Sequence, residues 1–393
     1  MILTTFQSEW LPLLRKVQDL GLITLSSKFQ DILRDAEIPS KALNEYANPV
    51  LFETATREAA RLVSTIYNSN FDTTKLPFKD TSIASGPSLA TYAYQRLFDM
   101  VSVILATEIA DPKLILLHND VEPLNRALAL WALQKHVPCL HVPHAVYLDT
   151  EGRGPAGTDV HDLITASIIA CAGPYQQQWY IERGAYPQTT IITGLPQFDR
   201  LANPQPNRER ACKLLNLDPR RPVVVYKSSW RQDTNLAGCH DGVEETYAAF
   251  LAMTKLVPDV QYLVSCHPRG NNLKWHLDQA QAANVSLSIT QEHLDVILNA
   301  ADILLCYGPS NVMLEMATLN SGHLVCINDK AAFPNDPEII KCPADAEQMA
   351  KVVQTCLTSS LPDYRNLVYK YLGPQDGHNT ERIAALIRQV HGA

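Results

Sequence analysis

The sequence contains no long hydrophobic run, no excess of basic residues and no closely spaced pair of cysteines. No stretch approaches the roughly eighteen consecutive apolar residues that indicate a membrane-spanning helix, so we expect none. The formal net charge is −8 at pH 7, which argues against a nucleic-acid partner because contact with many phosphates needs a basic face. What is left is a globular chain with 46% hydrophobic residues, enough to fill a sizeable core.

The nine cysteines are dispersed, and no two of them have CxxC spacing. This pattern predicts reduced thiols rather than a disulfide framework or a zinc site, and we expect neither a metal nor another cofactor. The first twenty residues lack the basic start and apolar core of a secretory signal, so we predict a cytoplasmic protein. A peripheral membrane contact stays open because Trp10, Leu11, Leu13 and Leu14 are spaced to share one helix face. The alternative is that they pack in the core.

With 393 residues the chain is long enough for two domains with full cores. Residues 1–110 show mainly helical spacing and few strands, which predicts a helical N-terminal part of the first domain. Short apolar runs then alternate with amphipathic segments, which predicts an α/β fold with parallel strands. Since the stretch after residue 203 is rich in proline and asparagine, we predict one αβ domain over 111–204 and another over 205–375. A final helix, 376–393, is predicted to cross back to the first domain.

The run YLVSC, residues 262–266, predicts a buried strand that ends in His267, Pro268 and Arg269. Ligands of parallel sheets bind beyond the carboxyl ends of the strands, so this cluster falls where a ligand would bind.

A second buried strand is predicted over residues 303–307, and the loop after it contains Gly308, Ser310 and Asn311. This loop runs into a helix that carries Glu315. A loop of this kind presents free backbone N–H groups and the positive end of the helix dipole, which suits a phosphate. We therefore expect a nucleotide monophosphate or diphosphate between the two loops.

A third strand, residues 223–226, is followed by Lys227 and then by Ser228, Ser229 and Arg231. Hydroxyl groups and a cation at the end of a strand suit phosphate contact, because cations bind phosphate by charge-assisted hydrogen bonds. The alternative for Arg231 is an ordinary surface ion pair.

In the first half of the chain, a strand over 114–118, a helix over 124–136 and a strand over 139–144 form a βαβ unit. Its loops bring Asp120 near His144 if the strands are neighbours, and an aspartate and a histidine there are candidates for a general base. The alternatives are that Asp120 caps the following helix and that His144 is a core histidine. The glycine-rich stretch 152–162 is either a lid or a plain surface loop.

Five segments together resemble the GT-B glycosyltransferases. They are HPR at 267–269, GPSNVMLEM at 308–316, TGLPQFDRL at 193–201, SSWR at 228–231 and DGHNTERIA at 376–384. The nearest branch is the capsule-polysaccharide and CDP-glycerol glycerophosphotransferase group. Bacterial sialyltransferases and the non-hydrolysing UDP-N-acetylglucosamine 2-epimerases are more distant.

The resemblance implies two Rossmann-like, doubly wound domains facing a cleft, with the acceptor in the first domain and the nucleotide donor in the second. His144 corresponds to a histidine needed for transfer, although Ala145 follows it where the family has glycine. His267 and Pro268 correspond to the donor-phosphate motif. Ser310 and Asn311 are then expected at the phosphates, with Asn311 standing where the family has a second serine, and Glu315 is expected at the ribose or base.

The implied activity is metal-independent transfer of a sugar or glycerophosphate from a CMP-, CDP- or UDP-activated donor to a hydroxyl group of a surface glycan or glycolipid. In this hypothesis His144 or Asp120 deprotonates the acceptor, and His267, Arg269 and Ser310 stabilise the leaving nucleotide. Two alternatives stay open. One is a sugar-nucleotide epimerase or hydrolase of the same fold, which would need no acceptor, and the other is a non-catalytic member of the group.

Overall fold

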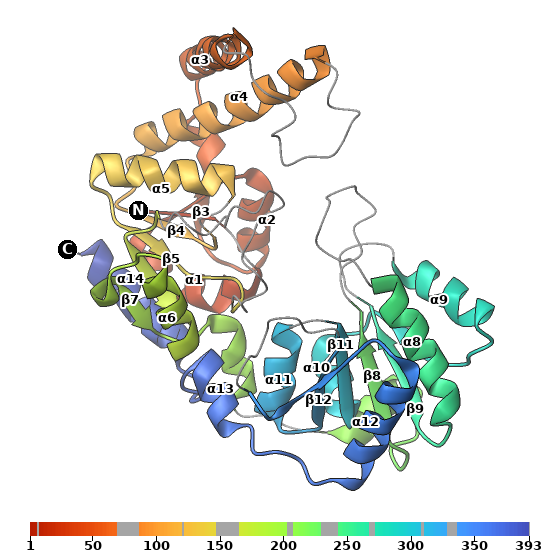
Figure 1. The fold of residues 1–393 in the computed structure, drawn as a ribbon. Coiled ribbons are helices and arrows are strands. Elements are labelled where there is room, and N and C mark those ends of the chain that lie inside the picture. The colour runs from red at the N-terminus through yellow and green to blue at the C-terminus, as the bar shows by residue number, and fades with distance from the viewer. Residues whose placement is uncertain are drawn as a thin grey trace. The chain divides into compact units, whose positions relative to one another are not determined.

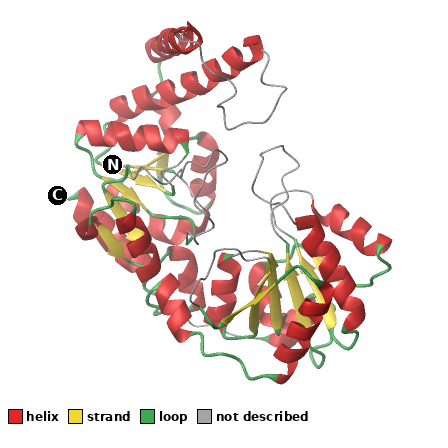
Figure 2. Ribbon diagram, in the orientation of Figure 1, coloured by secondary structure: helices red, strands yellow, loops and turns green. Residues whose placement is uncertain are grey.

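The structure is a computed structural model, and it describes residues 1–5, 8–68, 86–119, 122–146, 165–202, 207–228, 243–266, 272–307, 310–327 and 336–392. The chain divides into two compact units (Figure 1). Of the described residues, unit 1 contains 1–146, 165–199 and 372–392, and unit 2 contains 200–371. In each unit helices surround a parallel sheet (Figure 2), so the predicted α/β fold is confirmed.

Unit 1 is built on a seven-stranded sheet with the order β3-β2-β1-β4-β5-β6-β7, in which all neighbouring strands are parallel. The strands are β1 (Ile2–Thr4), β2 (Leu22–Thr24), β3 (Ser40–Ala42), β4 (Leu114–Leu117), β5 (Cys139–His141), β6 (Ile168–Cys171) and β7 (Thr190–Ile192). The order reverses between β1 and β4. The topological switch point of unit 1, where doubly wound sheets bind ligands, therefore lies beyond the carboxyl ends of these two strands.

Helices cover both faces of this sheet. Leu3, Ile23 and Ile115 share one core cluster with Leu128 and Trp131 of α5, on the face that α4 and α5 cover (Figure 1). The α-helices of unit 1 are α1 (Leu11–Val17), α2 (Ser27–Asp35), α3 (Pro49–Asn68), α4 (Gly86–Ala110), α5 (Pro123–Lys135), α6 (Pro174–Glu182) and α14 (Asn379–His391). Its 3-10 helices are η1 (Ser8–Trp10), η2 (Gln18–Leu20), η3 (Leu43–Tyr46), η5 (Pro187–Thr189) and η6 (Pro196–Leu201).

The interpretation of residues 1–110 as helical with few strands is wrong in part, because this region supplies β1, β2 and β3. Each of these strands has only three residues. All the residues of β1 and β2 are buried, so neither strand shows the apolar–polar alternation that marks a half-buried strand. Trp10, Leu13 and Leu14 are fully buried, which favours the core reading of this segment over a membrane contact.

The carboxylate of Asp199 holds the last helix of the chain, α14, in unit 1. Its two oxygens accept hydrogen bonds from the backbone N–H groups of Asn379 and Thr380, each at 2.8 Å. Gly194 lies beneath the same helix start with φ of +71°, and a Cβ there would come within 2.0 Å of the Asn379 side chain. Two of the segments behind the family resemblance, 193–201 and 376–384, are thus in direct contact at the start of α14.

Unit 2 contains a six-stranded parallel sheet with the order β10-β9-β8-β11-β12-β13. Its strands are β8 (Val223–Lys227), β9 (Gln261–Ser265), β10 (Ser288–Thr290), β11 (Ile303–Tyr307), β12 (His323–Ile327) and β13 (Ile339–Cys342). Its helices are α7 (Arg208–Leu214), α8 (Val243–Leu256), α9 (Asn272–Ala282), α10 (Leu294–Ala300), α11 (Asn311–Leu319), α12 (Ala346–Thr358) and α13 (Arg365–Leu372). The predicted strands at 223–226, 262–266 and 303–307 are confirmed, whereas β10 and β13 were not predicted.

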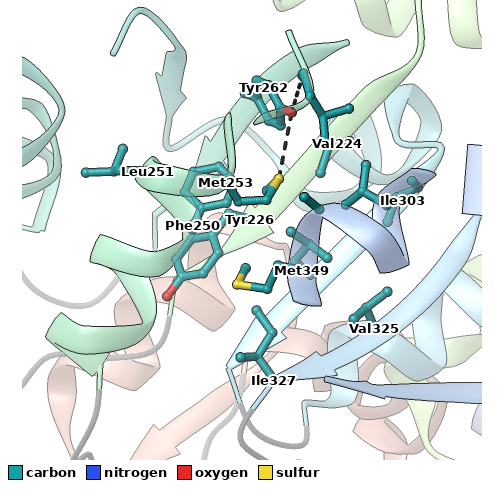
Figure 3. Close-up of a cluster of buried hydrophobic side chains, with 14 of the residues drawn as sticks. Val224, Tyr226, Phe250, Leu251, Met253, Tyr262, Ile303, Val325, Ile327 and Met349 are labelled. Carbon is teal, nitrogen blue, oxygen red and sulfur yellow. Dashed lines mark hydrogen bonds between the residues drawn. The ribbon is translucent and has the colours of Figure 1, made fainter. Parts of the chain in front are cut away.

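The core of unit 2 shows which strand residues face which layer. Val224 and Tyr226 of β8 pack with Phe250 and Met253 of α8 and with Met349 of α12 (Figure 3). The rings of Tyr226 and Phe250 stack with their centroids 4.7 Å apart. Because side chains alternate along a strand, the other residues of β8 face the opposite side of the sheet.

No helix in the described parts of the chain is both long and apolar enough to cross a membrane.

Candidate functional site

The strand order of unit 2 reverses between β8 and β11, so its switch point lies beyond Lys227 and Tyr307. Two predicted site residues are located at this edge. The buried Ser228 directly follows β8, and its backbone N–H donates a hydrogen bond to the carbonyl of Ser265 at 3.0 Å. Ser310 is the N-cap of α11, and its hydroxyl oxygen accepts a hydrogen bond from the N–H of Val312 at 3.3 Å.

Helix α11 begins at Asn311 and continues from β11, so its amino end opens towards this edge. A helix start of this kind offers backbone N–H groups and a positive partial charge to an anion. Of the sequence-predicted residues, the structure thus brings Ser228, Ser310 and Asn311 to the carboxyl edge of two adjacent strands.

Glu315 lies further along α11, with a side chain that is 12% exposed. Arg200 forms an ion pair with this carboxylate and another with Asp295 at the start of α10. Burial raises the pKa of Glu315, while the positive charges of Arg200 and Lys227 oppose that rise. Glu315 is therefore a partly buried acid that Arg200 holds in place.

Lys227 is the last residue of β8 and is only 9% exposed. Its Nζ donates to the carbonyl oxygens of Ser265 at 3.5 Å and Cys266 at 3.3 Å. Burial lowers the pKa of this ammonium group, and the nearby Cys306, Cys266 and Glu315 act against the shift. The sequence predicts phosphate contact for the cluster that contains Lys227, but it does not select Lys227 itself as a site residue. The signal was a lysine at the end of an otherwise apolar strand, VVVYK.

Among the described residues, Thr5, His118 and Asn119 supply polar side chains at the switch point of unit 1. The Thr5 hydroxyl oxygen accepts a hydrogen bond from the backbone N–H of His118 at 2.9 Å, and it lies 2.8 Å from Nδ1 of the same residue. Asn119, buried after β4, accepts from the side-chain amide of Asn125 at 3.1 Å and from the N–H of Glu122 at 3.0 Å. The sequence missed Thr5 because its strand was not recognised, and His118 because it was counted as the end of one.

His144 follows β5, and β5 is paired with β4 as predicted. Its backbone N–H donates to the carbonyl of His118 at 3.3 Å, and the two imidazole centroids are 6.0 Å apart at a steep angle. The His144 side chain is exposed, so the alternative of a core histidine is wrong. The backbone carbonyl of His144 accepts a hydrogen bond from the side-chain amide of Gln197 at 3.0 Å, which also holds the backbone at this position.

Several predicted residues lie outside the described parts of the chain. They are Asp120, Ser229, Arg231, His267, Pro268, Arg269 and Gly308, together with the stretch 152–162. Within the described ranges, no group of three or more histidine, cysteine, aspartate or glutamate residues could hold a metal ion.

A groove of about 490 Å³ lies at the opposite edge of the unit 2 sheet. Its wall includes Val260 and Gln261 at the start of β9, Ser288 at the start of β10, and the two basic residues Arg221 and Lys255. Since ligands of doubly wound sheets bind at the carboxyl ends of the strands, this groove does not coincide with the switch point.

Solved structures with similar folds span nearly the whole chain. UDP-GlcNAc 2-epimerase from Neisseria meningitidis, bound to UDP-GlcNAc, matches with a TM-score of 0.57 and 13% identity, covering 99% of both chains. A glycosyltransferase from Rickettsia africae matches with a TM-score of 0.53 and 11% identity, over 99% of this chain and 97% of its own. Anabaena Alr3699/HepE, in complex with UDP and glucose, matches with a TM-score of 0.51 and 13% identity, over 100% of this chain and 97% of its own.

No protein-family model matches the sequence, and no curated protein matches it either. The structural similarity therefore establishes the fold, which is of the GT-B type, as the sequence resemblance implied. The similar structures thus include UDP-GlcNAc 2-epimerases, a glycosyltransferase and a protein in complex with UDP and glucose.

Proposed function

We propose that the protein is a nucleotide-sugar enzyme that binds a UDP-activated sugar at the switch point of unit 2 and transfers the sugar to an acceptor hydroxyl group. The observation that carries the proposal is the set of groups at that edge. A capped helix start follows β11, and a buried lysine and a buried serine end β8. This combination suits the phosphates of a nucleotide. The UDP and UDP-sugar complexes among the similar structures support a uridine donor rather than a cytidine donor.

In this proposal, the first turn of α11 binds the phosphates through the N–H groups near Ser310 and Asn311. Glu315, which Arg200 holds in place, accepts hydrogen bonds from the ribose hydroxyls. The developing charge on the leaving UDP is stabilised by donors that are already in position before the reaction, which is electrostatic catalysis.

We propose His144 as the general base of unit 1. Its imidazole would take the proton of the acceptor hydroxyl as that oxygen attacks the anomeric carbon, and the bond from this carbon to the UDP phosphate oxygen would break. His118 would orient His144, because its carbonyl accepts the N–H of His144 and because Thr5 contacts its ring. The acceptor class, a surface glycan or glycolipid, rests on the family resemblance alone.

A UDP-sugar 2-epimerase is the second candidate. Epimerases from Neisseria meningitidis and Listeria monocytogenes match this chain over 99% of its length, which favours this candidate directly. An epimerase converts the sugar nucleotide without an acceptor, whereas a transferase needs one to complete its reaction.

The proposal is tested by thermal unfolding of the purified protein with UDP, CDP and GDP. A ligand at 100 times its dissociation constant stabilises the folded state by about 2.7 kcal/mol, so selective stabilisation by UDP is the expected result. Stabilisation by CDP alone would instead support a cytidine-activated donor. No stabilisation by any nucleotide would contradict the proposal and favour a non-catalytic protein.

Proton NMR of UDP-GlcNAc incubated with the protein and no acceptor then separates the two candidates. The transferase proposal predicts that the 2-epimer does not accumulate. Steady formation of the 2-epimer would replace the transferase with the epimerase.

A further inference from the structure

Lys227 ends the central strand β8, beside the point where the strand order of unit 2 reverses. In the sheet its neighbours in register are Ser265 of β9 and Cys306 of β11. Since Tyr226 faces the α8 and α12 layer, strand alternation directs Lys227 to the other face of the sheet. Glu315 of α11 acts on its pKa, which is consistent with that direction.

The ammonium group of Lys227 is buried at the end of β8. Among the described residues, no carboxylate oxygen lies within 4.0 Å of its Nζ, and its acceptors are two backbone carbonyls at 3.3 and 3.5 Å. An ammonium group has three N–H donors, and buried lysines are rare unless they are paired.

The groups around Lys227 leave its charge only partly compensated. Burial raises the pKa of the Cys266 thiol to about 11 and that of Cys306 to about 12, so both thiols are neutral at pH 7. Glu315 supplies the nearby negative charge, but its carboxylate is already paired with Arg200. A further negative charge at this edge would therefore be stabilised by Lys227.

A purely structural role explains this lysine poorly. A buried charge without a partner costs stability, and an apolar side chain of the same length would fill the same space without that cost. A cation at the carboxyl edge of a doubly wound sheet is explained if an anionic ligand completes its contacts.

We propose that Lys227 donates a hydrogen bond to a phosphate of the bound nucleotide and so discriminates nucleotides from nucleosides. The proposal rests on the proposed function and assigns to the same site a residue that recognises the phosphate and not the base or the ribose. Glu315 keeps Arg200 as its ion-pair partner, and in this proposal Lys227 pairs with the phosphate instead.

The test compares the affinities of UDP, UMP and uridine, measured by titration calorimetry, for four forms of the protein. These are the natural protein, Lys227→Met, Lys227→Arg and the control Lys255→Met. Lys255 is an exposed lysine on α8 outside the proposed site.

The proposal predicts that Lys227→Met weakens UDP binding about 10- to 100-fold, the range of a charge-assisted hydrogen bond, and leaves uridine binding unchanged. Lys227→Arg should recover part of the UDP affinity, and Lys255→Met should bind all three ligands as the natural protein does. Equal weakening of UDP and uridine, or no weakening of either, would overturn the role of Lys227 and leave the proposed function standing. If the natural protein binds no UDP, the proposed function and this inference both fail.

A second measurement uses the natural protein, in case Lys227→Met does not fold. Acetic anhydride labels neutral lysine amines, and mass spectrometry reports the label on each lysine. UDP and inorganic pyrophosphate should each lower the labelling of Lys227 relative to Lys255, and uridine should not. Labelling of Lys227 that is the same with and without UDP would contradict a phosphate contact.

Discussion

The two switch points occur in sheets of the same winding order but contain different kinds of polar group. Among the described residues at the unit 1 switch point, the Thr5 hydroxyl group is hydrogen-bonded to His118, and the Asn119 side chain accepts hydrogen bonds from the side chain of Asn125 and the backbone N–H of Glu122. In unit 2 the described residues at the switch point include the buried Lys227, the partly buried Glu315 and the capped start of α11. The described polar groups at the two edges thus differ, although the strands of both sheets follow the same order.

This difference matches the proposed function, in which unit 2 binds the nucleotide and unit 1 supplies the base for the acceptor. Charged groups in a buried site cost stability on their own, and their presence in unit 2 fits the proposed binding of a charged nucleotide there. Imidazole, hydroxyl and amide groups suit the hydroxyls of a sugar or acceptor and the movement of protons between them. Four predictions would break or sharpen this comparison.

Replacing His144 by alanine should have the largest effect. Loss of a general base lowers turnover by about 10²- to 10⁴-fold, and UDP affinity should stay the same because the proposed nucleotide site lies in unit 2. Steady-state kinetics and calorimetry measure the two quantities. The control is His136→Asn, which removes an exposed histidine while asparagine still tolerates the φ of +58° at that position. An unchanged turnover number would remove His144 from the mechanism.

Replacing Asp199 by alanine should destabilise unit 1 by about 2 to 3 kcal/mol, because two backbone N–H groups of α14 lose a charged acceptor. The matched change in unit 2 is Asp345→Ala. That side chain caps α12 through a single bond to Gln348 at 2.9 Å, and its loss should cost about 1 kcal/mol. Urea unfolding measures both variants. Equal losses would show that Asp199 is an ordinary cap.

Replacing Thr5 by valine should cost about 1 to 2 kcal/mol, because the N–H of His118 loses its acceptor at a buried position. Thr5→Ser keeps the hydroxyl group and should lose less. The comparison of the two variants by urea unfolding separates the hydrogen bond from the packing of the methyl group. If valine is tolerated as well as serine, the hydrogen bond between Thr5 and His118 does not stabilise the switch point of unit 1.

The smallest effect concerns the pH dependence of Glu315→Gln. Burial raises the pKa of Glu315 above its ordinary value of 4.5, so the folded state holds this proton more tightly than the unfolded state. As pH rises from 4.5 through the folded-state pKa, the natural protein therefore loses stability that the glutamine variant does not lose. Urea midpoints of the two proteins between pH 4 and pH 8 should diverge in that direction. A constant difference would contradict the pKa shift.

The sequence predicts the longer strands well because their runs of four or five apolar residues, such as Ile303–Tyr307, are bounded by polar residues. It does not predict β1 to β3 or β10, whose three residues each carry little pattern, whereas the equally short β5 is recognised because it follows a clear strand and helix. The pairing of β4 with β5, which brings His118 and His144 together, follows from the βαβ pattern.

Other features depend on partners that are distant in sequence. The segment around Asp199 contributes to the resemblance to the GT-B glycosyltransferases, and the structure shows that its carboxylate caps a helix 180 residues later. The ion pair of Glu315 likewise joins it to Arg200, 115 residues earlier, and no local pattern predicts that contact.

The most direct test of the central claim is a crystal structure of the protein with bound UDP. The account predicts the uracil nucleotide at the carboxyl edge of the unit 2 sheet, with its phosphates at the start of α11 and near Nζ of Lys227. UDP bound elsewhere, for example in the groove lined by Arg221 and Lys255, would contradict it.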